Sequence, residues 1–272
     1  MDTTFFSELN PLEQTLIGTF FTWLVAAVGA STVFFTTSMN KKFFQALLGF
    51  AAGIMLSASF FSLLLPSISQ SSQSSDMPYW IPVVTGFILG ASVICIADFI
   101  IRHFHRKNII ENPNSSDIDF ESKTVLVLAI TIHNIPEGLA IGVAFGAASL
   151  GIPEAGLAAA ISLTIGISLQ NFPEGLAVSM PLRAQGMSKI KSFWYGQLST
   201  TVEPVAGIFG AMFVVAAQPL LPYALSFAAG AMILVVIAKV MPESQREGKG
   251  ILPAVCFLIG FSAMMILDLA LS

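Results

Sequence analysis

The chain has 272 residues, of which 55% are hydrophobic and 10% are charged, with a mean hydropathy of +0.81 and a formal net charge of −4. A soluble domain carries about a quarter charged residues, so this composition excludes a soluble globular protein and predicts an integral membrane protein. No basic patch occurs, which argues against nucleic acid as a partner and leaves the lipid bilayer as the expected surroundings.

The apolar runs along the chain predict an all-α integral membrane protein, because about 20 apolar residues in a helix cross the hydrocarbon core of a bilayer. A single transmembrane domain over residues 1–272 is expected to contain eight transmembrane helices. They are predicted at approximately 12–37, 43–68, 79–103, 122–149, 154–180, 191–216, 220–241 and 250–271. The acidic start of the chain lacks the basic region of a cleaved signal, so the first run is expected to remain as a span.

The longest connection is expected at residues 104–121, between the third and fourth helices. It ends in a polar stretch with a proline, Asn112–Asp117, which is typical of a mobile loop. His103 and His105 lie at its start. They are candidates for a cytoplasmic metal relay or sensor, although two loop histidines are a weak signal.

The basic residues predict the orientation of the helices. All twelve fall at helix ends or connections on one side of the predicted bundle: Lys41, Lys42, Arg102, Arg106, Lys107, Lys123, Arg183, Lys189, Lys191, Lys239, Arg246 and Lys249. The other side has none and comprises both termini and residues 69–78, 150–153 and 217–219. The positive-inside rule therefore predicts a multi-pass protein of the cell membrane with both termini extracytoplasmic and the 104–121 loop in the cytoplasm.

One phrase occurs twice inside apolar stretches. Residues 133–140 read His-Asn-Ile-Pro-Glu-Gly-Leu-Ala, and residues 170–177 read Gln-Asn-Phe-Pro-Glu-Gly-Leu-Ala. A carboxylate at the bilayer centre costs roughly 2.5–3.5 kcal/mol on insertion scales, so intramembrane carboxylates usually line a functional polar site. Glu137 and Glu174 therefore indicate such a site in the fourth and fifth helices.

A second internal match suggests how the halves are related. Residues 48–55 match residues 225–232 at six of eight positions, and the helices that contain them are expected to be antiparallel. The two matches together predict a 3+2+3 inverted-repeat bundle, an arrangement typical of transporters. The alternative is that helices rich in Gly and Ala resemble one another because small residues permit close packing.

The residues around the repeated glutamates predict a metal site. Side chains three and four residues apart share one face of a helix, which places two polar side chains of each repeat beside its glutamate. Pro136 and Pro173 each remove a helical hydrogen bond, which frees a backbone carbonyl near the site. The candidate metal ligands are His133, Asn134, Glu137, Gln170, Asn171, Glu174 and, from the sixth helix, Glu203.

The chemistry of these ligands favours a divalent metal of intermediate hardness. Carboxylates with one imidazole suit zinc, iron, manganese and cadmium-like ions, and the lack of thiolates argues against Cu(I). Weak amide ligands favour release, so the ion is expected as a transported substrate and not as a cofactor.

On these residues the chain resembles the ZIP family of divalent metal transporters, in particular its GufA-like branch. The resemblance covers nearly the whole chain and implies movement of zinc and related ions toward the cytoplasm through a binuclear site. One position would contain His133, Gln170 and both repeat glutamates; the second would contain Asn134, Asn171 and Glu203, with the same glutamates bridging. The resemblance also suggests a homodimer.

Two residues depart from the family pattern. Asn171 replaces an aspartate found in some relatives, which should weaken or reshape the second position. Lys239 lies where relatives often have acidic residues; it either repels ions, pairs with Glu243 or extends to the membrane interface, and the last interpretation is favoured.

Four further residues are candidates for lining the path of the ion to and from the site. Asp268 either attracts arriving cations or is an ordinary solvated terminus. Asp98 lies on the exit route or, as is favoured, pairs with Arg102. Met55 and Ser62 are further candidates for the pathway, although core packing is the better interpretation for Met55.

Three functions compete. An alternating-access carrier is the main interpretation, and a passive divalent-metal channel is the nearest alternative. An intramembrane metalloenzyme is disfavoured, because the apolar stretches contain one histidine and no His-Glu-x-x-His motif. No catalytic residue is therefore expected.

Overall fold

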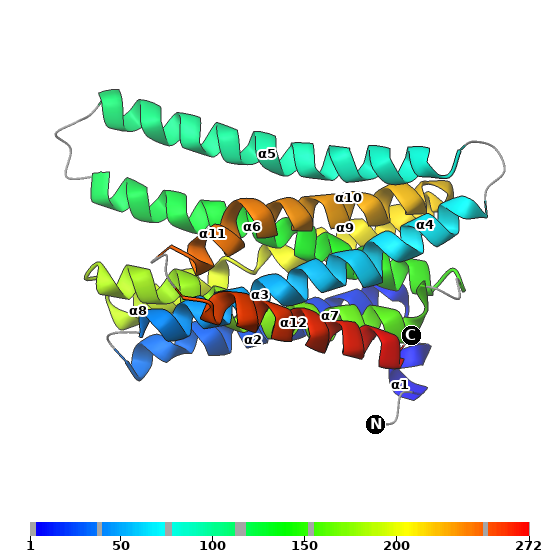
Figure 1. The fold of residues 1–272 in the computed structure, drawn as a ribbon, viewed down its shortest axis with the longest axis horizontal. Coiled ribbons are helices and arrows are strands. Elements are labelled where there is room, and N and C mark those ends of the chain that lie inside the picture. The colour runs from blue at the N-terminus through cyan, green and yellow to red at the C-terminus, as the bar shows by residue number, and fades with distance from the viewer. Residues whose placement is uncertain are drawn as a thin grey trace.

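The computed structural model describes residues 4–36, 40–73, 78–111, 118–151, 155–246 and 250–271. Within these ranges the chain is helical apart from short connections, and it contains no strand. The long helices run alongside one another as a bundle, with α1 and the end of α12 at the same end (Figure 1). The predicted all-α class is confirmed.

The helical elements follow the order of the predicted spans. In chain order they are α1 (Thr4–Glu8), α2 (Pro11–Ala30), η1 (Ser31–Phe34), α3 (Lys41–Ala58), η2 (Ser59–Leu64), α4 (Leu65–Ser72), α5 (Trp80–Glu111), α6 (Ile118–Ala148), α7 (Leu157–Ala184), α8 (Lys189–Leu198), α9 (Val202–Ala216), η4 (Gln218–Leu220), α10 (Leu221–Val235), η5 (Val236–Val240), α11 (Met241–Ser244) and α12 (Leu252–Leu271).

Six segments of the described chain are long and apolar enough to cross a membrane. They are Pro11–Phe34, Lys41–Ser72, Trp80–Ile101, Lys189–Ala216, Gln218–Ser244 and Leu252–Leu271. The fourth and fifth predicted spans correspond to α6 and α7, the two helices with the polar repeats. That these two also cross the membrane stays a prediction.

The prediction of a loop over residues 104–121 was wrong at both ends. Helix α5 continues to Glu111, and α6 begins at Ile118. Nothing in residues 104–111 breaks a helix, and arginine, lysine and glutamate favour one even where the chain leaves the bilayer. The turn signals are confined to residues 112–117, which lie outside the described part.

Two helices contain a π-helical segment, which the sequence analysis did not predict. In each case a proline follows directly: Pro66 after η2 and Pro242 after η5. A proline cannot donate to the carbonyl four residues earlier, which here belongs to Ser62 or Ala238 inside the π segment. The missing donor explains why the helical ladder is irregular at these places.

The bundle is built from closely packed pairs of helices: α2 with α7, α6 with α9, α3 with α12 and α5 with α10. Glycines bring the two central pairs together. A Cβ atom on Gly138 of α6 would lie 2.3 Å from the Glu203 carbonyl oxygen, and one on Gly175 of α7 would lie 2.1 Å from that of Ala26. Only glycine permits these approaches, because a real Cβ never comes so close to a backbone oxygen.

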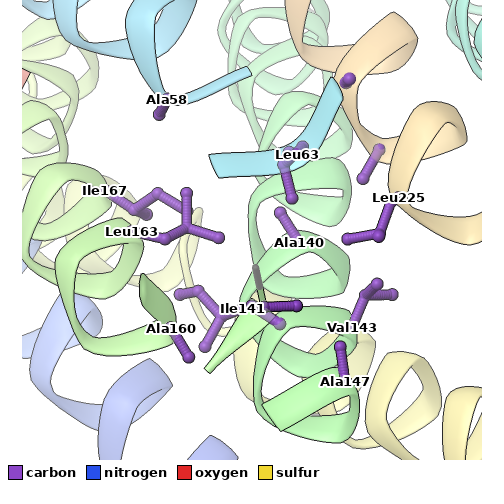
Figure 2. Close-up of a cluster of buried hydrophobic side chains, with 14 of the residues drawn as sticks. Ala58, Leu63, Ala140, Ile141, Val143, Ala147, Ala160, Leu163, Ile167 and Leu225 are labelled. Atoms are coloured by element: carbon purple, nitrogen blue, oxygen red, sulfur yellow. The ribbon is translucent and has the colours of Figure 1, made fainter. Parts of the chain in front are cut away.

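The largest apolar cluster fills one half of the bundle. Figure 2 shows its side chains from η2, α6, α7 and α10 directed toward one another, among them Leu63, Ile141, Leu163 and Leu225. The cluster members of α6 follow Glu137 and those of α7 precede Gln170. Because the two helices are antiparallel, the cluster lies between the polar repeat and the end of the bundle that holds α1.

Candidate metal-binding site

Three glutamates lie buried at the centre of the bundle. Glu137 of α6 and Glu203 of α9 are completely inaccessible, and Glu174 of α7 is 9% exposed. Glu137 interacts electrostatically with both other carboxyls. The structure therefore brings together the three acidic residues that the sequence indicated as ligands, from three different helices.

The position of Glu203 depends on a break in its helix. Helix α8 ends at Leu198 and α9 begins at Val202, so Glu203 lies in the first turn of α9. The free N–H groups and dipole of a helix N-terminus favour a negative charge there. Both carboxyl oxygens are also bonded: the hydroxyl of Thr22 donates to Oε2, and Asn171 Nδ2 donates to Oε1 at 2.8 Å.

The asparagine of the first repeat, Asn134, also forms a hydrogen bond to the break between α8 and α9. Asn134 Nδ2 donates a hydrogen bond of 2.8 Å to the carbonyl oxygen of Ser199, which lies between α8 and α9. A carbonyl in a helix break lacks its usual partner, and this amide supplies one. With the nitrogen used in this way, Asn134 Oδ1 is buried and has no hydrogen-bond partner among the described residues.

Buried oxygens without partners gather on the repeat residues. Within the described chain they include both carboxyl oxygens of Glu137, Oε2 of Glu174, Oε1 of Gln170 and Oδ1 of Asn171. A buried polar atom without a hydrogen bond lowers the stability of a protein by about 1–3 kcal/mol. A group of several such oxygens therefore requires an explanation. A divalent cation suits this set, because hard and borderline metals bind carboxylate and amide oxygens.

The imidazole lies at the edge of this arrangement. His133 is half-buried on α6, four residues before Glu137 and therefore on the same helix face. In the described residues, no group of three or more His, Cys, Asp or Glu side chains is close enough to hold a metal ion. The seven-residue ligand set thus stays a prediction, and a closed ligand shell requires further movement of the side chains.

A fourth buried carboxylate lies toward the end of the bundle that holds α1. Asp268 of α12 is 5% exposed and accepts hydrogen bonds from Ser62 Oγ at 2.7 Å and from Ser162 Oγ at 3.5 Å. The interpretation of Asp268 as a solvated terminus was therefore wrong. Met55 lies fully buried in an apolar cluster with Ile94, which confirms its packing role.

Lys239 has a partner that the sequence did not indicate. Its ammonium group forms an ion pair with Asp98 of α5, and the two side chains are 22% and 24% exposed. Pairing with Glu243 was wrong, because Glu243 accepts from Arg246 at 3.3 Å. Extension of the lysine to the membrane interface stays a prediction. The predicted Asp98–Arg102 pair involves a side chain outside the described part.

The two histidines of α5 give no support to a relay. His103 is exposed and stacks on Phe99, with ring centroids 6.0 Å apart. The His105 side chain lies outside the described residues. A metal relay at this end of α5 stays a prediction.

Sequence analysis missed Thr22 and Ser199. A single threonine in an apolar helix usually bonds to its own backbone, so nothing marks Thr22 as a partner of Glu203. For Ser199 a signal exists, since a run of Ser and Thr at 199–201 followed by Pro204 is unusual inside a span and indicates a helix break.

The buried carboxylates and amides within a multi-pass helical bundle define a membrane protein with a polar, cation-compatible centre. The family model for the ZIP zinc transporters matches residues 121–268. The chain is 37% identical to zinc transporter ZIP11 of Bos taurus over 96% of this chain and 98% of that protein. It is 38% identical to zinc transporter ZIP11 of Homo sapiens, over 95% and 97% of the two chains.

A bacterial relative is also similar over nearly its full length. Zinc transporter GufA of Myxococcus xanthus is 33% identical over 94% of this chain and 98% of its own. The chain therefore belongs to the ZIP family of zinc transporters, as its repeats predicted. Members of this family are transporters and not enzymes, which confirms the exclusion of a metalloenzyme.

Proposed function

We propose that this protein carries divalent transition-metal ions, zinc foremost, across the cell membrane toward the cytoplasm by alternating access. The observation that supports this function is the cluster of buried, unpartnered oxygens on Glu137, Glu174, Gln170 and Asn171. A transported cation satisfies these oxygens while it is bound and leaves them when the site opens. Iron, manganese and cadmium ions have compatible ligand preferences and are the next candidates.

Two metal positions share the repeat glutamates in this proposal. The first contains His133 and Gln170 with Glu137 and Glu174. The second contains Asn134, Asn171 and Glu203 with the same two glutamates bridging. The electrostatic interaction of Glu137 with Glu174 and Glu203 supports a shared site, because carboxylates this close are stabilised by a cation between them.

An inverted repeat of eight transmembrane helices gives the protein two halves that can rock about the site. The close contacts support it. A Cβ on Gly53 of α3 would lie 2.0 Å from the Phe257 carbonyl of α12, and one on Gly230 of α10 would lie 2.1 Å from the Phe87 carbonyl of α5. Gly53 and Gly230 are equivalent in the repeat, so the pairs α3–α12 and α10–α5 correspond.

The central helix pairs, α2 with α7 and α9 with α6, show the same correspondence between the two halves of the repeat. The spacing in sequence from Ala26 to Glu203 equals that from Gly53 to Gly230, and both Ala26 and Glu203 offer their carbonyl oxygens to a repeat glycine. The proline-linked π segments η2 and η5 also fall at corresponding places. Close packing of helices rich in Gly and Ala does not by itself require the same sequence spacing at all these places. The equal spacing therefore favours an inverted repeat over a chance likeness between such helices.

A carrier is favoured over a passive channel by the apolar cluster of Figure 2. Leu63, Leu163 and Ile167 are fully buried in it, between the polar site and one end of the bundle. A conducting channel needs a hydrated path on both sides of its site, and this layer is filled by buried apolar side chains. In a carrier, the layer opens only when the site closes toward the other side.

The orientation of the proposed carrier in the membrane follows from the distribution of charge. The starts of α3 and α8, with Lys41 and Lys189, lie at the end of the bundle opposite to α1 (Figure 1). The positive-inside rule favours this end as cytoplasmic, with both termini extracytoplasmic. Asp268 then lies on the extracytoplasmic side of the site, where it can attract arriving cations.

Zinc uptake into proteoliposomes tests the proposed function. Glu137→Gln and Glu174→Gln each remove one bridging charge and should abolish uptake while the protein stays folded. Glu243→Gln is the matched control, because Glu243 is half-exposed and bonded to Arg246. Uptake at the wild-type rate in either bridging variant would rule out the central site.

A further inference from the structure

The glutamates of the site differ in how their oxygens are occupied. No hydrogen bond of ordinary geometry reaches either oxygen of Glu137, which has the Gln170 and Glu174 side chains beside it, whereas both oxygens of Glu203 are bonded. The partners of Glu203 come from two other helices: the Thr22 hydroxyl from α2 and the Asn171 amide from α7. No group of three His, Cys, Asp or Glu side chains in the described residues is close enough to hold a metal ion, so Glu203 must turn to join a ligand shell, and turning breaks at least one of these bonds.

Each of the two donors has a second acceptor within reach. Thr22 Oγ1 lies 2.8 Å from the carbonyl oxygen of Thr19, and Asn171 Nδ2 lies 3.4 Å from that of Thr22. When Glu203 turns away, the hydroxyl and the amide can both donate to the α2 backbone. No buried donor is then left unsatisfied, so the release costs the strength of the bonds to Glu203 but adds no penalty for an unpaired donor.

We propose that Thr22 is a positioning residue, which holds Glu203 out of the second metal position until the first position is filled. The inference rests on the proposed binuclear site and concerns the order in which its positions are occupied. An ion at the first position neutralises Glu137 and Glu174. The second ion binds only if it displaces the hydrogen bonds that hold Glu203, whereas the first ion meets carboxylates that are not held in this way.

The expected size of the effect follows from the strength of the bond. A hydrogen bond to a charged group contributes 1.5–3 kcal/mol, which corresponds to roughly ten- to hundred-fold in an equilibrium constant. Removal of the Thr22 hydroxyl should tighten the second zinc-binding step by about ten-fold or more and leave the first step unchanged. The Asn171 bond stays in place, so Glu203 is still oriented.

The chain contains a matched control on the same helix. Thr19 is as deeply buried as Thr22, but its hydroxyl bonds only to α2 carbonyls, at 2.8 Å to Thr15 and 3.3 Å to Leu16. Thr22→Val and Thr19→Val therefore make the same chemical change with and without the contact to Glu203. Thr22→Ser keeps the hydroxyl and should restore wild-type binding; Thr22→Ala provides a second variant without the hydroxyl.

Calorimetric titration of the purified protein with zinc measures both steps. The proposal expects a tighter second step in Thr22→Val and Thr22→Ala, and wild-type values in Thr22→Ser and Thr19→Val. An unchanged or weaker second step in both hydroxyl-free variants would overturn it. Glu203→Ala, which leaves no ligating atom at this position, separates this failure from failure of the binuclear site: if two steps persist in Glu203→Ala, the second position itself is wrong.

Discussion

Asn171 donates a hydrogen bond of 2.8 Å from its side-chain nitrogen to Glu203 Oε1, and this bond joins α7 to α9 at the centre of the bundle. The amide carries no charge, so it stabilises the glutamate without adding to the negative charge of the site. Its own oxygen is buried and has no hydrogen-bond partner in the described chain. One residue thus orients a carboxylate and carries a buried oxygen of a kind that suits a cation.

Replacement of this amide by a carboxylate should link stability to metal. Asn171→Asp removes the donor and places a second negative charge beside Glu203, so the metal-free protein should lose about 1.5–3 kcal/mol of stability. Zinc should restore more stability to the variant than to the wild type. Thermal unfolding with and without zinc measures both effects, and an equal zinc-induced shift in the two proteins would contradict the proposed role of Asn171.

Acidification should weaken metal binding. Carboxylates and imidazole bind a metal only when deprotonated, so protons compete with zinc for Glu137, Glu174, Glu203 and His133. The zinc dissociation constant should therefore rise from about pH 7.5 to about pH 5.5, a range in which imidazole also gains its proton. Titration in buffers of matched ionic strength checks this, and a constant affinity would exclude these residues as the principal ligands.

The Asp98–Lys239 ion pair should show strong coupling. Each side chain is about three-quarters buried, so replacement of Asp98 leaves the Lys239 charge without this partner in an apolar setting. Asp98→Asn and Lys239→Met should each destabilise the protein more than a surface substitution, and the double variant should regain about 0.5–3 kcal/mol relative to additivity. Unfolding midpoints of the four proteins give the coupling; additive effects would show that the pair contributes nothing.

Helix approach at the repeat glycines should be essential. Gly175→Ala places a Cβ 2.1 Å from the Ala26 carbonyl oxygen, so α2 and α7 must separate. A loss of roughly 1–3 kcal/mol of stability is expected, with a larger loss of transport because the site is built on these helices. Gly250→Ala is the control, since a Cβ there has its nearest neighbour at 3.9 Å. Equal stability of the two variants would refute the tight contact.

The sequence predicted the helical class and the buried carboxylates because these depend on local patterns. Glu137 and Glu174 stand out in apolar stretches, and any helix that holds them must bury them. The boundaries of α5 and α6 were misjudged because charged residues near a helix end resemble a loop. Nothing in such a pattern shows whether the helix continues into the aqueous phase.

Partners from distant parts of the chain could not be predicted in this way. Thr22 and Glu203 lie on different helices, as do Asp98 and Lys239, and their contacts are set by how the helices rotate and cross. The π segments before Pro66 and Pro242 depend on the same packing. A proline signals that one hydrogen bond is missing, but tertiary contacts decide whether the helix bends, breaks or widens.

The buried apolar layer of Figure 2 also determines where the membrane potential acts. An electric field is steepest across the part of a protein that contains neither water nor mobile ions, and that part here lies between the polar residues and one end of the bundle. A doubly charged ion that passes the whole potential gains roughly 4.6 kcal/mol per 100 mV. In the proposed carrier, most of that energy becomes available in the movement that carries the ion past Leu63 and Leu163, so the voltage dependence of uptake should report on this movement and not on the binding of the metal.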